Sequence, residues 1–192
     1  GLRVGFTDTA SAGAKSGTAT ITLASDGTFN SGVPTPLTPQ TITLNAAVYR
    51  LAQASAHTPE PVTLANQRVG GTATQALSLT NTAANDGFSE RLNASFTGTT
   101  GAATASGSFA LLAAGSTNTS SLRVGVDTAT AGAKSGTATL TLQSDGTATS
   151  GFGALGIGTQ TVNVAGNVYQ VAQPAIPASV NLGNVRAGAS PT

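Results

Sequence analysis

The sequence predicts an all-β protein in which antiparallel sheets pack face to face as a sandwich. The first observation is the alternation of apolar and polar residues in Thr18–Leu23 and again in Thr137–Leu142, which has the period of a half-buried strand. The second is the dipeptide that follows each segment, Asp26–Gly27 and Asp145–Gly146, because Asp-Gly accepts the positive φ of a tight turn. The third is that no window of comparable length has a convincing helical period.

The other expected strands show the same alternation. Their polar positions are often threonine, whose branched side chain suits the solvated face of a pleated sheet. We therefore expect about seven strands in each complete domain. The alternating segments are Leu2–Phe6, Leu77–Leu79, Leu92–Phe96, Leu122–Val126 and Val162–Val168.

The composition excludes several classes of function. Only 8% of the 192 residues are charged, and the eight Lys and Arg residues are scattered. We therefore do not expect the protein to bind nucleic acid or an anionic membrane. No stretch approaches the roughly 18 consecutive apolar residues of a spanning helix, so membrane insertion is not expected. The absence of cysteine excludes disulfides and thiolate metal sites. Abundant Thr, Ser, Gly and Ala favour an extracellular bacterial repeat protein over a cytoplasmic enzyme.

The chain repeats itself after about 120 residues. The ten residues Asp8–Gly17, DTASAGAKSG, return as Asp127–Gly136, DTATAGAKSG, and the only change is Ser11 to Thr130. Matches continue in order on both sides, so the similarity extends over a domain rather than one motif. The further matching pairs are Leu2–Gly5 with Leu122–Gly125, Ser25–Thr28 with Ser144–Thr147, Val48–Tyr49 with Val168–Tyr169, and Val62–Asn66 with Val180–Asn184.

This period suits a domain of immunoglobulin size. The expected boundaries lie in the two proline-bearing connectors, 54–61 and 174–177, because proline removes backbone donors and stiffens a linker. We expect residues 1–53 to be the C-terminal part of one Ig-like repeat and 54–173 to be a complete repeat. Residues 174–192 would then hold the opening strand of a following repeat.

We interpret the repeated ten residues as a loop between two strands. Aspartate can accept backbone hydrogen bonds in its own turn, and glycine supplies unusual backbone angles. A phosphate-binding loop is not favoured, because that motif needs Gly directly before Lys, whereas Ala14 precedes Lys15. Calcium is a weaker alternative, since backbone carbonyls could supplement the carboxylates. The calcium candidates are Asp8, Asp26, Asp127 and Asp145.

No constellation of residues indicates catalysis. His57 is the only histidine and lies in the first connector, so we expect an exposed linker residue rather than a member of a catalytic triad. Glu60 and Glu90 are the only glutamates and do not form a recognisable carboxylate pair. We therefore expect no enzymatic activity, no cofactor and no catalytic metal.

The complete repeat resembles a known family of bacterial Ig-like repeats. The elements that carry the resemblance are Val62-x-Leu64, Arg68-x-Gly70, Gln75–Thr82, Asp86–Glu90, Leu92–Ala94, Leu111–Gly115, Leu122–Gly125 and the repeated ten residues that follow. In this order they resemble the Ig-like repeats of bacterial secreted proteins that are often labelled "choice-of-anchor D". The resemblance covers most of the chain and implies an exported, modular role at the cell surface. It transfers no catalytic or binding residues.

These observations lead to two expected functions. The first is a non-enzymatic stalk, fibre or scaffold segment whose partners are neighbouring repeats or copies of itself, joined by strand complementation. The expected assembly strand consists of Val180, Asn181, Leu182, Gly183 and Asn184. The alternative is an adhesin-type module that binds glycan, ice or another surface protein through threonine-rich faces or aromatic residues. Its aromatic candidates are Tyr49, Tyr169, Phe29 and Phe152.

Overall fold

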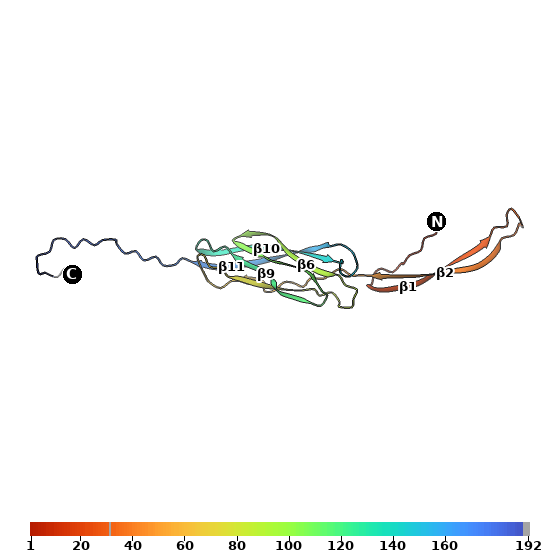
Figure 1. Ribbon diagram of the computed structural model, residues 1–192, viewed down its shortest axis with the longest axis horizontal. Helices are drawn as coiled ribbons and strands as arrows, with labels where there is room; N and C mark the ends of the chain where they lie inside the picture. The colour runs from red at the N-terminus through yellow and green to blue at the C-terminus, as the bar shows by residue number, and fades with distance from the viewer. Residues whose placement is uncertain (31, 190–192) are drawn as a thin grey trace.

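The computed structural model describes residues 1–30 and 32–189 and is all-β, as the sequence predicts. Figure 1 shows an elongated molecule with a β-hairpin at one end, a sandwich in the middle and an extended C-terminal segment at the other end. The hairpin consists of β1 (Gly13–Ser25) and β2 (Thr35–Val48), paired antiparallel. None of the described residues belongs to a helix that could cross a membrane.

The sandwich has two sheets and nine strands in the described residues, two more than the expected number of about seven. Two of the nine are only two residues long. The larger sheet contains β3 (Val62–Thr63), β4 (Gln67–Arg68), β11 (Leu155–Tyr169), β10 (Gly132–Asp145), β6 (Arg91–Gly101) and β8 (Ser108–Leu112). The smaller sheet contains β5 (Thr74–Thr80), β9 (Thr117–Val126) and β7 (Ala103–Ser106), in that order.

The core lies between these two sheets and follows the predicted alternation. Along β10, Ala138, Leu140 and Leu142 are buried while the threonines between them are partly exposed. Branched apolar residues from the facing sheet complete the core, because period-two patterning places every second side chain inside. The other branched members of the cluster are Val62, Leu64, Leu77, Leu79, Leu92, Leu122, Val124, Val126, Val162, Val164 and Val168.

The hairpin repeats the pairing of β10 with β11. Gly17 lies opposite Leu44 in the hairpin, and their counterparts Gly136 and Val164 are opposite each other in the sandwich. The environment differs, however, because the described residues supply no second sheet to cover the hairpin. Leu23 and Ile42 on its apolar face therefore remain 39% and 38% exposed.

The expected strand Leu2–Phe6 does not form. Its counterpart Leu122–Val126 is held in β9 between two neighbours, β5 and β7. Among the described residues, no strand pairs with the backbone of Leu2–Phe6. Residues Leu2 and Val4 instead border a shallow groove beside Ile21 and Ile42 of the hairpin.

The first proline-bearing connector is part of the sandwich and not a loose linker. Residues 50–69, which we call the edge segment, first pair with the smaller sheet, through bridges from Ala54 to Asn81 and from Thr58 to Ser78. They then cross to the larger sheet, where β3 and β4 pair in parallel with β11. Ala52 is already buried in the core, so the packed unit begins before the expected boundary at residue 54.

Residues 170–189 contain no strand, and the expected assembly strand Val180–Asn184 pairs with no strand of the described residues. Gly183, inside it, has a φ of +67°, and its N–H donates to the side-chain oxygen of Asn181 at 2.9 Å. One turn of the edge segment nevertheless recurs there. Gly71 N–H donates to the carbonyl of Arg68 at 2.9 Å, and Ala189 N–H donates to that of Arg186 at 3.1 Å. Gly70 and Gly188, inside these turns, have φ of +79° and +85°, which favours glycine.

The repeat provides a matched test of core packing. Leu140→Ala should lower the free energy of unfolding of the sandwich by about 2–5 kcal/mol, because Leu140 is fully buried and its loss leaves a cavity. Ile21→Ala alters the counterpart in the uncovered hairpin and should change it by less than about 0.5 kcal/mol. Urea unfolding followed by circular dichroism measures both. Equal losses in the two variants would contradict the assignment of the core.

Candidate functional site

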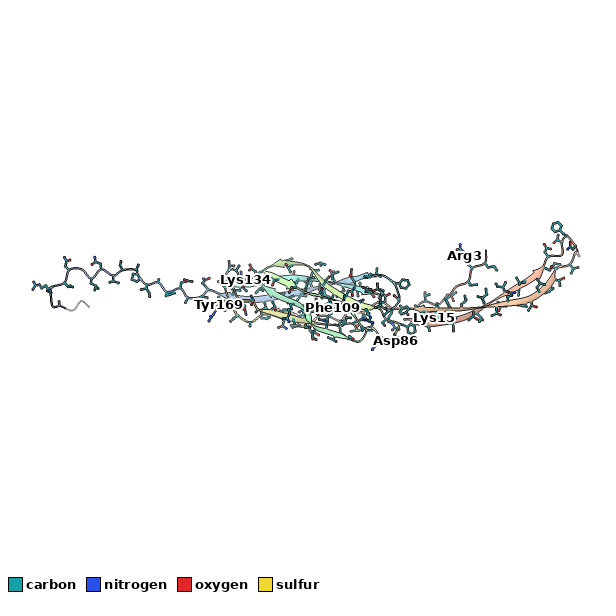
Figure 2. All side chains as sticks on the ribbon, viewed as in Figure 1. Arg3, Lys15, Asp86, Phe109, Lys134 and Tyr169 are labelled. Atoms are coloured by element: carbon teal, nitrogen blue, oxygen red, sulfur yellow. The ribbon has the colours of Figure 1, made fainter. Side chains whose placement is uncertain are left out.

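The junction between the hairpin and the sandwich is held by backbone hydrogen bonds and an ion pair. Arg50 follows β2 almost directly, and its backbone N–H donates to the carbonyl of Phe88 while its own carbonyl accepts from the N–H of Glu90. Its guanidinium donates to both carboxylate oxygens of Asp86, at 2.8 and 2.7 Å, and to the hydroxyl of Ser89. Figure 2 shows Asp86 at the end of the sandwich that faces the hairpin.

Two further effects strengthen this junction. The hydrogen bond from Arg50 is the main reason that the pKa of Asp86 lies below its usual value, so the carboxylate stays charged further into the acid range. The ring of Tyr49 packs beside that of Phe88, with centroids 5.7 Å apart. Two consecutive residues, Tyr49 and Arg50, thus join the hairpin to the sandwich through a ring contact, an ion pair and backbone hydrogen bonds.

Behind the junction, the edge segment is held by a buried carboxylate. Ala52 N–H donates to the hydroxyl of Ser144 at 2.8 Å, and that hydroxyl donates to Glu90 at 2.7 Å. Ser150 donates to the second oxygen of Glu90 at 2.6 Å. Glu90 is only 4% exposed, so these hydroxyls replace water around the carboxylate. A Cβ at Gly146 would lie 2.5 Å from Glu90, which explains the glycine.

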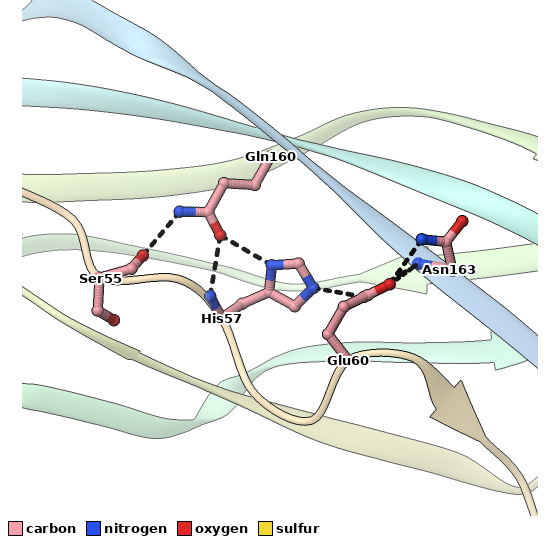
Figure 3. A network of polar contacts seen from close by, with 5 residues as sticks. All are labelled: Ser55, His57, Glu60, Gln160 and Asn163. Atoms are coloured by element: carbon pink, nitrogen blue, oxygen red, sulfur yellow. Dashed lines mark hydrogen bonds and ion pairs between the residues drawn. The ribbon is translucent and has the colours of Figure 1, made fainter.

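A second polar network holds the edge segment where it crosses between the sheets (Figure 3). Gln160 on β11 accepts from the backbone N–H of His57 at 3.0 Å and donates to the carbonyl of Ser55 at 2.7 Å. Its amide orientation is thereby defined, and its oxygen also lies 2.8 Å from His57 Nδ1. His57 Nε2 lies 2.7 Å from Glu60. Both ring nitrogens of His57 therefore face oxygen atoms of neighbouring side chains.

Glu60 links this network to β11. It accepts from the side-chain amide of Asn163 at 2.6 Å as well as from its backbone N–H. Partial burial alone would raise the pKa of Glu60, but the hydrogen bonds from Asn163 and His57 outweigh it and lower this pKa. The expectation that His57 is an exposed linker residue was wrong, because its ring is 6% exposed and packed against β11. Its contacts are those of a structural tie.

The four calcium candidates are all engaged in turns. Asp26 and Asp145 each accept from the backbone N–H and the hydroxyl of the threonine two residues later. Asp8 and Asp127 likewise accept from the backbone N–H two residues later. Within residues 1–30 and 32–189, no three His, Cys, Asp or Glu residues come together to hold a metal ion. Only the first half of each repeated stretch is a turn. The expectation of a loop over all ten residues was wrong, because Gly13–Gly17 and Gly132–Gly136 already belong to β1 and β10.

The lysine of the repeated stretch bonds the same hydroxyl in both copies, and Lys15 in addition forms an ion pair with Asp8 at 3.1 Å. Lys15 donates to the hydroxyl of Ser11 at 2.8 Å, and Lys134 donates to that of Thr130 at 2.8 Å. The exchange of serine for threonine keeps this hydroxyl. Figure 2 shows Lys15 beside the junction and Lys134 near Tyr169 at the far end of the sandwich. Each copy of the loop thus lies at the end of its unit from which the chain continues.

The aromatic candidates for ligand binding do not form one patch. Tyr49 contacts Phe88 in the junction. Phe29 is exposed in the β1–β2 turn, and Phe152 is exposed in the β10–β11 loop. Tyr169 ends β11 at the opposite end of the sandwich. No shared aromatic surface is formed by these four side chains.

Sequence reasoning missed most of the groups that make the junction. Arg50 lies 36 residues before its partner Asp86, and Glu90 lies 54 residues before its partner Ser144. No local sequence pattern marks either pair. One signal was present: Ser144 and its counterpart Ser25 both precede the repeated Asp-Gly turn. A serine kept at an inward-facing strand position could have been identified as a buried hydrogen-bonding residue.

Comparison with known proteins provides little further information. No family model and no curated protein matches the chain. Among solved structures, it is similar to the ASH/PapD-like domain of human CEP192 (PapD-like domain 7), with 9% sequence identity and a TM-score of 0.40. The match covers 64% of this chain and 89% of that domain. A similarity of this degree carries no argument about function.

The buried carboxylate can be tested with a matched pair of serine variants. Ser144→Ala should lower the free energy of unfolding by about 1–3 kcal/mol, because the N–H of Ala52 and one oxygen of Glu90 lose their partner. Ser25→Ala changes the exposed counterpart in the hairpin and should have an effect below about 0.5 kcal/mol. Chemical denaturation measures both, and an unchanged midpoint for Ser144→Ala would refute the role of this serine.

The tie at Glu60 predicts a defined dependence on pH. Because the pKa of Glu60 is lowered on folding, its contribution to stability is complete above the unfolded value of about 4.3 and is lost as pH falls through the folded value. Glu60→Gln removes that contribution. The difference in unfolding free energy between wild type and Glu60→Gln should therefore shrink on acidification. A difference that is constant or grows towards low pH would contradict the network.

Proposed function

We propose that this protein is a non-enzymatic structural module, one part of a tandem array of Ig-like units in an extracellular bacterial surface protein. The repeat in the sequence and the charge-poor, threonine-rich composition support this proposal. The observation that carries it is the junction, where Tyr49 and Arg50 connect the end of β2 to the sandwich. Contacts of this number can hold two neighbouring units in a fixed relative orientation, which a stalk or spacer requires.

The path of the chain also suits a load-carrying spacer. The chain enters the sandwich at the junction and leaves beyond Tyr169 at the opposite end (Figure 1). The edge segment and β11 run parallel, and Leu64 and Val69 donate backbone hydrogen bonds to Ala165 and Tyr169. A pull on the two ends slides these neighbours along each other. Because shear loads their hydrogen bonds together, the unit resists extension better than a hairpin opened from one end.

The alternative, an adhesin-type binding module, has weaker support. Its candidate surface is the threonine-rich outer face of β6 and β10. There the hydroxyls of Thr97 and Thr141 lie 2.9 Å apart, and those of Thr100 and Thr137 lie 2.7 Å apart. These hydroxyls bond each other across the strands, which uses part of their capacity to bind a glycan or ordered water. We therefore favour the structural role.

The spacer function predicts a rigid junction. Spin labels on cysteines introduced at Thr20 in β1 and Thr99 in β6, both exposed positions in a chain without native cysteine, report the distance between the two parts. Electron double resonance should give one narrow distance distribution. Arg50→Ala should broaden it, because the ion pair with Asp86 and the bond to Ser89 are lost.

The matched control for this experiment is Arg91→Ala. Arg91 is an arginine of the sandwich that makes one long contact, at 3.5 Å, with a backbone carbonyl, so its removal should leave the distribution unchanged. A broad distribution in the wild type would mean that the junction bends freely. That result would overturn the proposed role as a rigid spacer.

A further inference from the structure

A shallow groove, which we call the outer groove, crosses the outer face of the larger sheet between the edge segment, β11 and β10. Its two halves, of about 360 and 380 Å³, adjoin at Ser135 and Ala165. The strand register places Thr63, Ala165 and Ser135 side by side on three neighbouring strands, and all three are exposed. These short side chains form the floor of the groove.

Longer polar side chains form the two walls of the outer groove. Asn163 of β11 and Thr137 of β10 are opposite each other and border one half. Asn66 of the edge segment and Asn167 of β11 border the other half. A strand rises about 3.3 Å per residue, so the four steps from Asn163 to Asn167 separate the walls by about 13 Å. This width leaves room for a ligand of the size of a sugar ring.

Most polar groups of the outer groove are available to a ligand. Asn163 donates to Glu60 through its amide nitrogen, and Figure 3 shows its side-chain oxygen pointing away from that carboxylate. By contrast, the hydroxyls of Thr97 and Thr141, elsewhere on the larger sheet, bond each other. Within the described part of the chain, the side chains that line the groove and make no hydrogen bond are those of Thr63, Asn66, Ser135 and Asn167.

The charges beside the outer groove are one cation and one anion. Lys134 donates to the hydroxyl of Thr130, and Glu60 accepts from Asn163. The other polar groups of the groove are neutral amides and hydroxyls, so a ligand with a large net charge gains little there.

The apolar part of the outer groove is small. Its exposed apolar residues are Pro61, Ala133 and Ala165, and none of them is aromatic or branched. A protein partner usually depends on large apolar or aromatic side chains at the centre of its contact surface. The lining of the groove therefore favours a neutral, hydroxyl-rich ligand over a protein surface.

We infer that the outer groove binds a neutral oligosaccharide. Amides and hydroxyls both donate and accept hydrogen bonds, as sugar hydroxyls do, so the unpaired groups of the walls and floor suit such a ligand. Pro61 and Ala165 add apolar contact for the C–H face of a sugar ring. The site lies away from the junction and goes beyond the structural role, because a spacer that carries it would also hold a polysaccharide.

The repeat supplies a matched variant in which the floor of the groove is filled. Asn45 is opposite Ser16 in the hairpin, where Ala165 is opposite Ser135 in the sandwich. The larger side chain is thus accommodated at the same place of the same strand pair. Ala165→Asn should therefore fill the outer groove without disturbing the exposed surface of β11 around it.

Titrations followed by nuclear magnetic resonance test the site on the isotope-labelled protein. The probes are cellotetraose, maltotetraose and chitotetraose, which are all neutral. At least one of them should shift the backbone amide signals of Thr63, Ser135 and Ala165 in a saturable way. Ala165→Asn should weaken this binding by about tenfold or more, because the added side chain occupies the floor. Asn167→Ala, which introduces the residue of the matching position Ala47, should also weaken it.

The control is Ala110→Asn, the same substitution at an exposed alanine of β8 in the same sheet, which should bind like the wild type. The absence of saturable shifts with all three probes up to about 10 mM would overturn the inference. Equal weakening by Ala165→Asn and Ala110→Asn would also overturn it. Tighter binding of a sulfated heparin tetrasaccharide would contradict the assignment to a neutral ligand.

Discussion

The structure depends on the pairing of one segment with both sheets. Residues 50–69 contribute bridges to β5 and parallel pairs to β11, so they close the two sheet edges that border the entrance to the sandwich. Unpaired edges expose backbone donors and acceptors and favour uncontrolled association. The segment solves this problem within the unit. Because the hairpin leads directly into this segment, the pairing of the segment also determines the direction in which the hairpin leaves the sandwich.

The position of the edge segment is determined by polar contacts more than by apolar burial. Its buried apolar residues are few and small or branched: Ala52, Val62 and Leu64. Directional bonds therefore specify its path, from Ser144 and Glu90 behind the junction to Gln160 and Asn163 at the crossing. The side chain of Asn81 adds four more bonds. It accepts from the N–H groups of Gln53 and Ala83, and it donates to the carbonyls of Glu90 and Leu112. No buried side-chain nitrogen or oxygen of the described residues lacks a partner.

The two copies of the repeat show that matching residues can have the same local geometry but different burial. Their turns are reproduced closely: Gly32 and Gly151 N–H donate to the carbonyls of Gly27 and Gly146, both at 2.8 Å. Local geometry of this kind is encoded within a few residues. Burial is not, because Leu140 is fully buried in the sandwich while its counterpart Ile21 is only partly covered. The same strand is a core element in one copy and an open edge in the other.

The sequence by itself determined the all-β class, the alternation of the long strands, the repeat and the turns at Asp26 and Asp145, because all of these depend on period-two patterning and on bonds between near neighbours. It could not determine that the proline-bearing connector is a buried tie, that His57 faces Gln160, or that Glu90 lies beside Ser144. Those contacts join residues more than 50 positions apart, so no local spacing reports them. It also predicted a strand at Leu2–Phe6 that does not form. Tertiary structure decided each of these points, because a polar or apolar side chain acquires its role only when a distant segment is placed beside it.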